Sequence, residues 1–468
     1  MGERLTRGIR LLAAGLLAGA VPLGAATYYV APPPAGSDAN PGTLALPWAT
    51  LPHAAAAVGP GDTVLVRAGS YTGFQLTTSG APGARITFRA YPGEQPAIVA
   101  DNPSTPDGIN LEGASYVTIE GFRVDGRGRA GIRAVLCREV EIRGNSADAN
   151  QRWGIFTGCC EDLTIAYNVT TGSLLEHGIY VSNSGDRPVI RGNLSAANRA
   201  SGIHMNGDLS VSCGGFVPTD GIISDALVEG NVLLGNGAGG GSGINCDGVQ
   251  GATIRNNLIA DSRASGISLF QQDGGAPSHG NTVVGNTVHV AAGGRWALNV
   301  QDGSTGTVVR NSFFWSDHSY RGAMNVCPAC LAGFSSDRNA LEDRFTLDDG
   351  ATVLTLAAWR SATGQDASSF VATPAALFVD AANLDYHLRP GSPAEDAGVP
   401  FPGLVEDLAG TPRPLGGGVD IGAFEAIFGC GFESGSRFGF SAATPPSRPM
   451  PAGEMAKLHS LVASNSLA

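Results

Sequence analysis

The feature that most constrains the fold of this chain is a Gly-Ile strand motif that returns five times. Side chains of a strand alternate between two faces, so each copy has one aliphatic face and one face that changes from copy to copy. A constant inner face beside a variable outer face is typical of a stacked solenoid that carries a binding surface. The copies are Gly154-Ile155-Phe156-Thr157, Gly178-Ile179-Tyr180-Val181, Gly202-Ile203-His204-Met205, Gly243-Ile244-Asn245-Cys246 and Gly266-Ile267-Ser268-Leu269.

Asparagines form a second regularity, because one follows a Val/Ile-rich segment in most units. Their spacings are 23, 25, 38, 26, 29 and 25 residues. We interpret each unit as a strand, an Asn turn, a second strand, a loop and the Gly-Ile strand, which together make one coil. Asn tolerates the left-handed conformation and can hydrogen-bond to its neighbour in the next coil. The turn asparagines are Asn145, Asn168, Asn193, Asn231, Asn257, Asn286 and Asn311.

This pattern predicts an all-β parallel solenoid of three-strand coils with an Asn ladder. No helical segment of 8–20 residues separates the strands, which excludes a doubly wound α/β sheet. An antiparallel sandwich would not place Asn after the same strand at a nearly fixed period. We expect a short helix over Thr50–Val58, with Thr50 as N-cap, to cover the open end of the solenoid.

The chain divides into segments of different composition. We predict an N-terminal cap with the first coils at 27–115, the repeats at 116–334, and an irregular β module at 335–428. Residues 429–468 are Ser/Pro/Ala-rich and are expected to be disordered. Residues 1–26 combine arginines, an apolar run and small residues before Thr27, as in a secretory signal peptide.

Composition limits the partners of the chain. The net charge is −12, and the single lysine is Lys457. Nucleic-acid binding requires clustered basic residues, so it is not expected. No later segment holds 18 apolar residues, so no membrane span is expected. We predict a monomer that is secreted or held at the cell surface, in an extracellular or periplasmic location.

Eight cysteines suit an oxidising compartment. Cys137 and Cys160 each lie eight residues before a turn asparagine. They should therefore stack on neighbouring coils ~4.8 Å apart, within disulfide reach. Cys327 and Cys330 could form a local disulfide. Cys246 occupies an inward position and is expected to be a buried thiol.

Several motifs resemble secreted right-handed parallel β-helix proteins of the pectate-lyase-like superfamily. Trp48-Ala49-Thr50-Leu51 and Gly61-Asp62-Thr63-Val64 are similar to the N-terminal cap of bacterial members. The segment from Leu377 to Glu425 resembles the C-terminal module of bacterial surface β-helix proteins. The resemblance covers roughly residues 27–425 and implies a right-handed β-helix. It also implies a polysaccharide lyase, hydrolase or epimerase, or a non-catalytic adhesin.

The outer faces of the Gly-Ile strands hold the candidate site. Alternation predicts two outward rows, and stacking makes His204, Asn206, Asn245 and Asp247 one polar patch. Residues Leu209–Ser224 are inserted directly after the His204 strand; such a loop is either functional or a tolerated insertion. The remaining candidate binding residues are His177, Tyr180, Asn183, Arg152 and Phe270.

We expect a lyase that cleaves a uronate-containing polysaccharide by β-elimination. His204 is the candidate base near neutral pH. Arg187, Arg152 or a Ca²⁺ ion held by Asp208 and Asp247 could neutralise the substrate carboxylate. If the reaction is hydrolysis instead, Asp208 and Asp247 are the candidate acid and base. The remaining alternative is a non-catalytic surface protein that binds a glycan with the same face.

Overall fold

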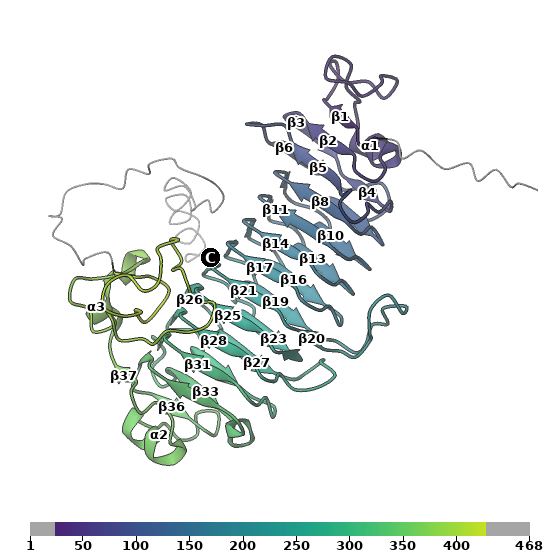
Figure 1. Cartoon of the computed structure of the whole chain (residues 1–468). Helices are drawn as coiled ribbons and strands as arrows, with labels where there is room; N and C mark the ends of the chain where they lie inside the picture. Colours follow the sequence, from purple (N-terminus) through teal and green to yellow (C-terminus); the bar gives the residue numbers. More distant parts are fainter. Residues whose placement is uncertain (1–23, 427–468) are drawn as a thin grey trace, which may run out of the picture.

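The computed structural model describes residues 24–426, which form one long solenoid with a smaller module packed along its side (Figure 1). Three parallel sheets run the length of the solenoid. Sheet A comprises β1 (Thr27–Val30), β2 (Thr63–Val66), β5 (Ile86–Ala90), β8 (Val117–Glu120), β11 (Val140–Arg143), β14 (Thr164–Ala166), β17 (Val189–Arg191), β21 (Leu227–Glu229), β25 (Thr253–Arg255), β28 (Thr282–Val284), β31 (Val308–Arg310) and β34 (Ser335–Asp337).

Sheets B and C follow sheet A in each coil, separated by a turn and a loop. Sheet B comprises β3 (Gly69–Thr72), β6 (Pro96–Ala100), β9 (Arg123–Val124), β12 (Ser146–Asp148), β15 (Val169–Thr171), β18 (Leu194–Ala196), β22 (Val232–Leu234), β26 (Leu258–Ser262), β29 (Thr287–Val290), β32 (Phe313–Ser316), β35 (Ala340–Leu341) and β37 (Phe370–Val371). Sheet C comprises β4 (Phe74–Leu76), β7 (Ile109–Glu112), β10 (Ala130–Val135), β13 (Trp153–Gly158), β16 (Ile179–Ser182), β19 (Ile203–Asn206), β23 (Ser242–Asp247), β27 (Ser265–Phe270), β30 (Leu298–Val300), β33 (Met324–Val326) and β36 (Phe345–Thr346).

This arrangement confirms the predicted parallel β-helix of three-strand coils. The Gly-Ile motifs begin strands of sheet C, and their register pairs Ile179 with Ile203 and Ile203 with Ile244. These isoleucines are fully buried in one continuous apolar core that fills the interior. Burying each such side chain contributes roughly 1.5–3 kcal/mol.

Asparagines at the turn from sheet A to sheet B form a hydrogen-bonded ladder along the solenoid. Asn231 Oδ1 accepts from the backbone and side-chain nitrogens of Asn193, both at 2.9 Å. Asn231 in turn donates from its side chain to Asn257 Oδ1 at 3.0 Å and to Ile190 O at 2.9 Å. The left-handed residue is the one before each ladder asparagine, as at Gly230 with φ of 62°. The ladder asparagine contributes hydrogen bonds rather than a left-handed backbone.

Asn311 was predicted as a ladder residue, and this prediction is wrong by one position. Ser312 occupies the ladder, where its Oγ accepts from the amide of Asn286 at 3.2 Å. Asn311 has the left-handed conformation, with φ of 52°. Its side chain exchanges two hydrogen bonds with the backbone of Val399 in the C-terminal module. Because Asn311 directly precedes Ser312, the spacing of asparagines in the sequence did not reveal this shift.

Helices close both ends of the interior. α1 (Leu51–Ala57) has Thr50 as its N-cap and buries Leu51, as predicted. At the far end, α2 (Leu356–Thr363) inserts Trp359, which is fully buried and stacks on Phe345 at 5.2 Å. The parallel coils extend through β34 to β37, so the predicted end of the repeats at residue 334 is too early. Helix α2 interrupts these last coils and obscures their period.

The C-terminal module packs on the outer face of sheet B. It contains the antiparallel pair β38 (Phe378–Asp380) and β39 (Asp385–Leu388), preceded by α3 (Pro374–Leu377). Phe378 and Tyr386 form an apolar cluster with Leu194, Leu258 and other outward residues of sheet B. The module therefore covers sheet B from β15 onward and leaves the outer face of sheet C uncovered (Figure 1).

The disulfides differ from the prediction at one site. Cys327 and Cys330 are bonded as predicted, and Cys246 is a buried free thiol. Cys137 and Cys160 stack inside the solenoid but remain free thiols, so their predicted disulfide is wrong. The Cys160 thiol donates to Gly158 O at 3.2 Å, whereas Cys159 points outward and bonds to Cys213. Sequence spacing located the coils but not which of two adjacent cysteines faces a partner.

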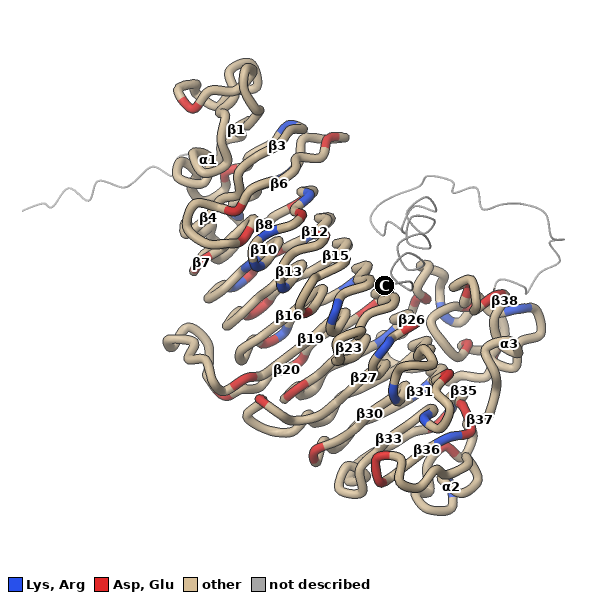
Figure 2. Tube along the Cα trace, turned by 180° about the vertical axis from the view of Figure 1, so that it is seen from behind, with Lys and Arg blue, Asp and Glu red and all other residues tan. Residues whose placement is uncertain are grey.

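Two predictions fall largely or wholly outside the described residues: the signal peptide, apart from 24–26, and the tail at 429–468. Within residues 24–426, no helix combines the length and apolar character needed to cross a membrane. Acidic and basic residues are interspersed along the Cα trace of the solenoid in Figure 2.

The Asn ladder should contribute strongly to stability. We expect Asn231→Ala to lower the free energy of unfolding by about 3 kcal/mol, because it leaves several buried backbone and amide groups unpaired. Chemical denaturation measures the change. The control is Gln151→Ala, which removes an exposed amide and should alter stability by less than about 0.5 kcal/mol. Equal stability of the two variants would contradict the structural role of the ladder.

Candidate functional site

The candidate site lies on the outer face of sheet C, where the register aligns outward side chains into rows. Tyr180 pairs with His204, and His204 with Asn245. A second row runs from Asn206 through Asp247 to Phe270. Both predicted outward rows are confirmed over these strands, because the parallel ladder stacks equivalent residues directly on one another.

His204 forms a hydrogen-bonded pair with His177. The amide of Ser201 donates to Nδ1 of His177 at 3.1 Å, so this nitrogen holds a lone pair. The proton of a neutral His177 is therefore on Nε2, which lies 3.0 Å from Nδ1 of His204. Nδ1 of His204 accepts the hydrogen bond from this N–H group. The proton of a neutral His204 is therefore on its Nε2. The backbone thus fixes the tautomer of both rings.

The electrostatics of the pair keep both rings neutral. Burial lowers the pKa of His177 to about 4. Burial, with repulsion from His177, lowers the pKa of His204 well below its usual value. His204 Nε2 is buried without a hydrogen-bond partner among the described residues. A nitrogen that already carries a proton cannot accept another, so His204 is a hydrogen-bond donor in this arrangement and not the base we predicted.

Asp247 stabilises a loop. Its carboxylate accepts hydrogen bonds from the backbone amides of Gln272 at 2.8 Å, Asp273 at 2.8 Å and Gly274 at 3.1 Å. Its exposed fraction is 2%. These contacts hold the loop after β27 against sheet C. Because both carboxylate oxygens are occupied and shielded, Asp247 is not suited to act as an acid or a base.

Calcium does not fit Asp208 and Asp247. Asp208 accepts from Asn183 Nδ2 at 3.3 Å and from the amide of Ser210 at 2.8 Å. Ca²⁺ requires 6–8 oxygen ligands, but the Asp247 oxygens face backbone N–H groups. Within residues 24–426, no group of three His, Cys, Asp or Glu side chains could hold a metal. We therefore assign no step to calcium.

The two predicted arginines are engaged elsewhere. Arg187 forms a two-point ion pair with Asp162, at 2.7 and 3.1 Å. This contact raises the pKa of Arg187 above its usual value. Arg152 pairs with Glu176 at 2.7 Å. Each guanidinium therefore already has a carboxylate partner within the chain.

The inserted loop 209–224 folds back along the edge of sheet C. The Cys159–Cys213 disulfide fixes it to the coil of β13. Phe216 packs under the guanidinium of Arg138, 4.9 Å from the ring centre, and its carbonyl accepts a hydrogen bond from Arg138 at 2.6 Å. The amide of Leu209 donates to Asp273 O at 3.1 Å, so the insertion also joins the loop that Asp247 holds. The insertion and the loop after β27 therefore lie against each other at one edge of sheet C.

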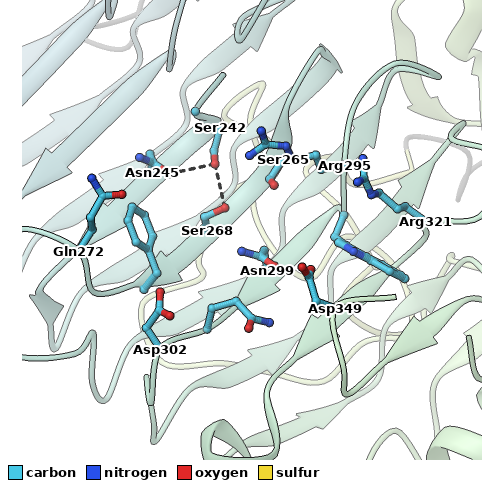
Figure 3. A pocket seen from close by; sticks show the side chains of 14 residues that line it. Ser242, Asn245, Ser265, Ser268, Gln272, Arg295, Asn299, Asp302, Arg321 and Asp349 are labelled. Carbon is cyan, nitrogen blue, oxygen red and sulfur yellow. Dashed lines mark hydrogen bonds between the residues drawn. The ribbon is translucent and has the colours of Figure 1, made fainter. Parts of the chain in front are cut away.

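An open pocket of about 660 Å³ lies on sheet C over β23, β27 and β30, beyond the histidine pair (Figure 3). Arg295 and Arg321 lie toward one end, Gln272 and Asp302 toward the other, and Asn299 and Asp349 between them. Of the predicted residues, only Asn245 and Phe270 line it. The lining residues are Gly241, Ser242, Asn245, Ser265, Ser268, Phe270, Gln272, Arg295, Trp296, Asn299, Gln301, Asp302, Arg321 and Asp349.

The pocket presents many hydrogen-bond donors. Within the described chain, neither Arg295 nor Arg321 lies within ion-pair distance of a carboxylate. Buried nitrogens of two other lining residues, Trp296 Nε1 and Gln301 Nε2, lack partners among the described residues. The pocket therefore combines these amide, indole and guanidinium donors with the carboxylates of Asp302 and Asp349.

Sequence reasoning missed both pocket arginines, although the sequence carries a signal for them. Each lies three residues before the first inward residue of its sheet C strand, Leu298 or Met324. The predicted site is centred on the clearest Gly-Ile motif, whereas the coils that contain Arg295 and Arg321 lack that motif. The polar residues of adjacent coils and these arginines meet only because the coils stack.

The chain matches two family models over consecutive segments of the solenoid. Residues 28–171 match "Pel9A-like, right handed beta helix region", and residues 173–326 match "Right handed beta helix region". The uncharacterized protein YwoF of Bacillus subtilis (strain 168) is 26% identical over 250 residues, which are 53% of this chain. The match spans 45% of the length of that relative.

Two solved structures share the fold over most of this chain. The crystal structure of pectate lyase Pel9A has a TM-score of 0.59 at 18% identity, covering 86% of this chain and 96% of that one. The complex of XylC with xylose has a TM-score of 0.51 at 10% identity, covering 86% and 99%. At these identities the likeness shows the fold alone.

If Asp247 is structural, Asp247→Asn should destabilise the protein by about 2 kcal/mol, since it weakens charge-assisted hydrogen bonds to buried amides. Hydrogen exchange should increase at residues 271–275, and chemical denaturation gives the stability change. Asp273→Asn, at an exposed neighbouring carboxylate, is the control and should change little. A variant of unchanged stability and unchanged exchange would restore Asp247 as a candidate for chemistry.

The neutral histidine pair predicts a pH dependence of stability. The unfolded chain protonates His177 near its ordinary pKa of about 6.5, whereas the folded protein does so only at about 4. The unfolded state therefore binds more protons between these values, and stability should fall by about 3 kcal/mol as pH decreases from about 6.5 to about 4. Urea denaturation of His177→Gln across this range should show a shallower slope. His53→Gln, at a partly exposed ring, should keep the original slope.

Proposed function

We propose that this chain, a right-handed parallel β-helix of the pectate-lyase-like superfamily, binds and cleaves an acidic polysaccharide on the outer face of sheet C. The observation that carries the proposal is the pocket whose two arginines have no ion-pair partner among residues 24–426. Guanidinium groups bind carboxylates through paired hydrogen bonds. A uronate carboxylate between Arg295 and Arg321 would therefore fix one sugar in the pocket.

β-Elimination is the reaction that we place first. It removes the proton at C5, moves the electron pair into a C4–C5 double bond, and breaks the bond from C4 to the glycosidic oxygen, which takes up a proton from water and leaves as a hydroxyl group. Negative charge develops on the carboxylate, where Arg295 and Arg321 would stabilise it. We assign proton transfer to Asp349, which lines the same pocket and receives a hydrogen bond from Asn325 at 2.9 Å. A carboxylate is a weak base, so the arginines would supply much of the catalysis by acidifying C5.

Hydrolysis is the second candidate because the pocket also holds a second exposed carboxylate, Asp302. Paired with Asp349, it would provide the acid and base that hydrolysis requires, and their separation would decide the stereochemical outcome. This pair takes the place of Asp208 and Asp247, whose carboxylates accept hydrogen bonds from the backbone of the loops. The alternative of glycan binding without cleavage uses the same arginines.

An exported location suits this function. The described chain contains the disulfides Cys159–Cys213 and Cys327–Cys330. Disulfides persist in oxidising compartments, outside the cytoplasm. Polysaccharides of cell walls and matrices are found in the same compartments, so location and substrate class agree.

The decisive experiment incubates the protein with polygalacturonate, alginate and other acidic polysaccharides, with Ca²⁺ and with EDTA. We expect new reducing ends together with the absorbance of an unsaturated uronate. Reducing ends without that absorbance would indicate hydrolysis. No cleavage of any polymer, with binding retained, would leave the non-catalytic function, and neither cleavage nor binding would refute the proposal.

Arg321→Gln and Arg295→Gln should each lower kcat/KM by about 100-fold, the effect of removing one charge-stabilising donor. Arg89→Gln is the matched control, because Arg89 is exposed on sheet A, away from the pocket. Activity that survives both pocket substitutions would show that the carboxylate is bound elsewhere.

A further inference from the structure

A stack of aromatic rings lies on the outer face of sheet C, on the side of the pocket toward the N-terminus. The ring centres of Trp153 and Phe156 are 4.4 Å apart, with planes 28° from parallel. Phe156 meets Tyr180 edge-on at 5.4 Å. Tyr180 in turn stacks on His204 at 4.9 Å, with an angle of 13°. We call Trp153, Phe156 and Tyr180 the aromatic platform; all three are half-buried.

Polar contacts at the ring edges hold the platform in place. Trp153 Nε1 donates to Glu176 Oε2 at 2.7 Å, and the other oxygen of Glu176 pairs with Arg152 at 2.7 Å. The hydroxyl of Tyr180 accepts from Asn206 Nδ2 at 3.1 Å. These hydrogen bonds satisfy the polar edges and fix the rings before any ligand binds. Fixed rings lose little conformational entropy on binding.

The platform and the pocket share one continuous row. The register pairs Phe156 with Tyr180, Tyr180 with His204, and His204 with Asn245, which lines the pocket. Tyr180 and Asn245 are thus two ladder steps apart, or ~10 Å. The row changes from aromatic to polar residues as it enters the pocket, where Ser268 and Asn299 follow.

We propose that the aromatic platform binds sugar rings of the same polysaccharide chain whose uronate occupies the pocket. Pyranose rings present C–H groups of slight positive charge, which the negative faces of aromatic rings attract. The platform would therefore bind the polymer through the ring surfaces that its internal stacking leaves exposed, whereas the pocket binds one carboxylate. This inference rests on the proposed function and extends it: the protein prefers long chains to short oligosaccharides, and Trp153 determines that preference.

The test compares binding of polygalacturonate and alginate with binding of their disaccharides, by affinity electrophoresis and fluorescence titration. Trp153→Ala should bind the polymer about tenfold more weakly and the disaccharide as well as the wild type does. Trp153→Phe should restore most of the polymer affinity, since it restores a ring. Tyr167→Ala removes a half-buried ring outside the platform, on the turn after β14, and should behave as wild type.

The outcomes separate this inference from the proposed function. Polymer binding that Trp153→Ala leaves unchanged, while Arg321→Gln abolishes it, would overturn the platform and keep the pocket. Equal losses for polymer and disaccharide in Trp153→Ala would also overturn it, because that pattern indicates damage to the pocket. If the wild type binds neither ligand, both proposals fail. Self-association that Trp153→Ala abolishes would assign the platform to a protein contact and overturn this inference.

Discussion

The hydrogen-bonded ladder between successive coils is the interaction on which the rest of the structure depends. Parallel pairing sets neighbouring coils ~4.8 Å apart and fixes the register between their strands. The buried asparagines reinforce this at the turn, as where Asn231 joins Asn193 and Asn257. Each residue lies directly over its equivalent in the next coil. An outward side chain therefore lies next to the outward side chains of the coils before and after it. The site is therefore a consequence of the stack.

This constraint explains the chemistry of the histidine pair. His177 and His204 come from adjacent coils, and their contact of 3.0 Å is set by the ladder and by the Ser201 amide. Two rings held this closely with little solvent favour the neutral state, since a charge on either would be desolvated and repelled. The tautomers then follow from one backbone donor. His204, which the sequence suggested as a base, is therefore a hydrogen-bond donor because of its contact with His177, 27 residues away in the chain.

Loops decide how the face is used. The carboxylate of Asp247 accepts hydrogen bonds from the amides of the loop after β27. The Cys159–Cys213 disulfide attaches the insertion that follows β19 to the coil of β13. Together they border the face of sheet C, while the C-terminal module covers sheet B from β15 onward. The pocket arginines enter from the loops that precede β30 and β33. The aromatic platform and the pocket with its two arginines share one row of sheet C, which is the arrangement that the proposed binding of a long acidic glycan uses.

The sequence by itself determined the solenoid, the inward row of isoleucines, the capping helix after Thr50 and the outward rows through His204 and Asp247. These depend on period and alternation, which are local properties of the chain. Only the tertiary structure decided that Cys159 bonds to Cys213, that Ser312 replaces Asn311 in the ladder, and that Arg295 and Arg321 meet in one pocket. Such contacts join residues from different coils and loops, whose geometry has no period. The sequence therefore indicated the candidate face, and the packing of loops upon it decided which of its polar groups lack partners among the described residues.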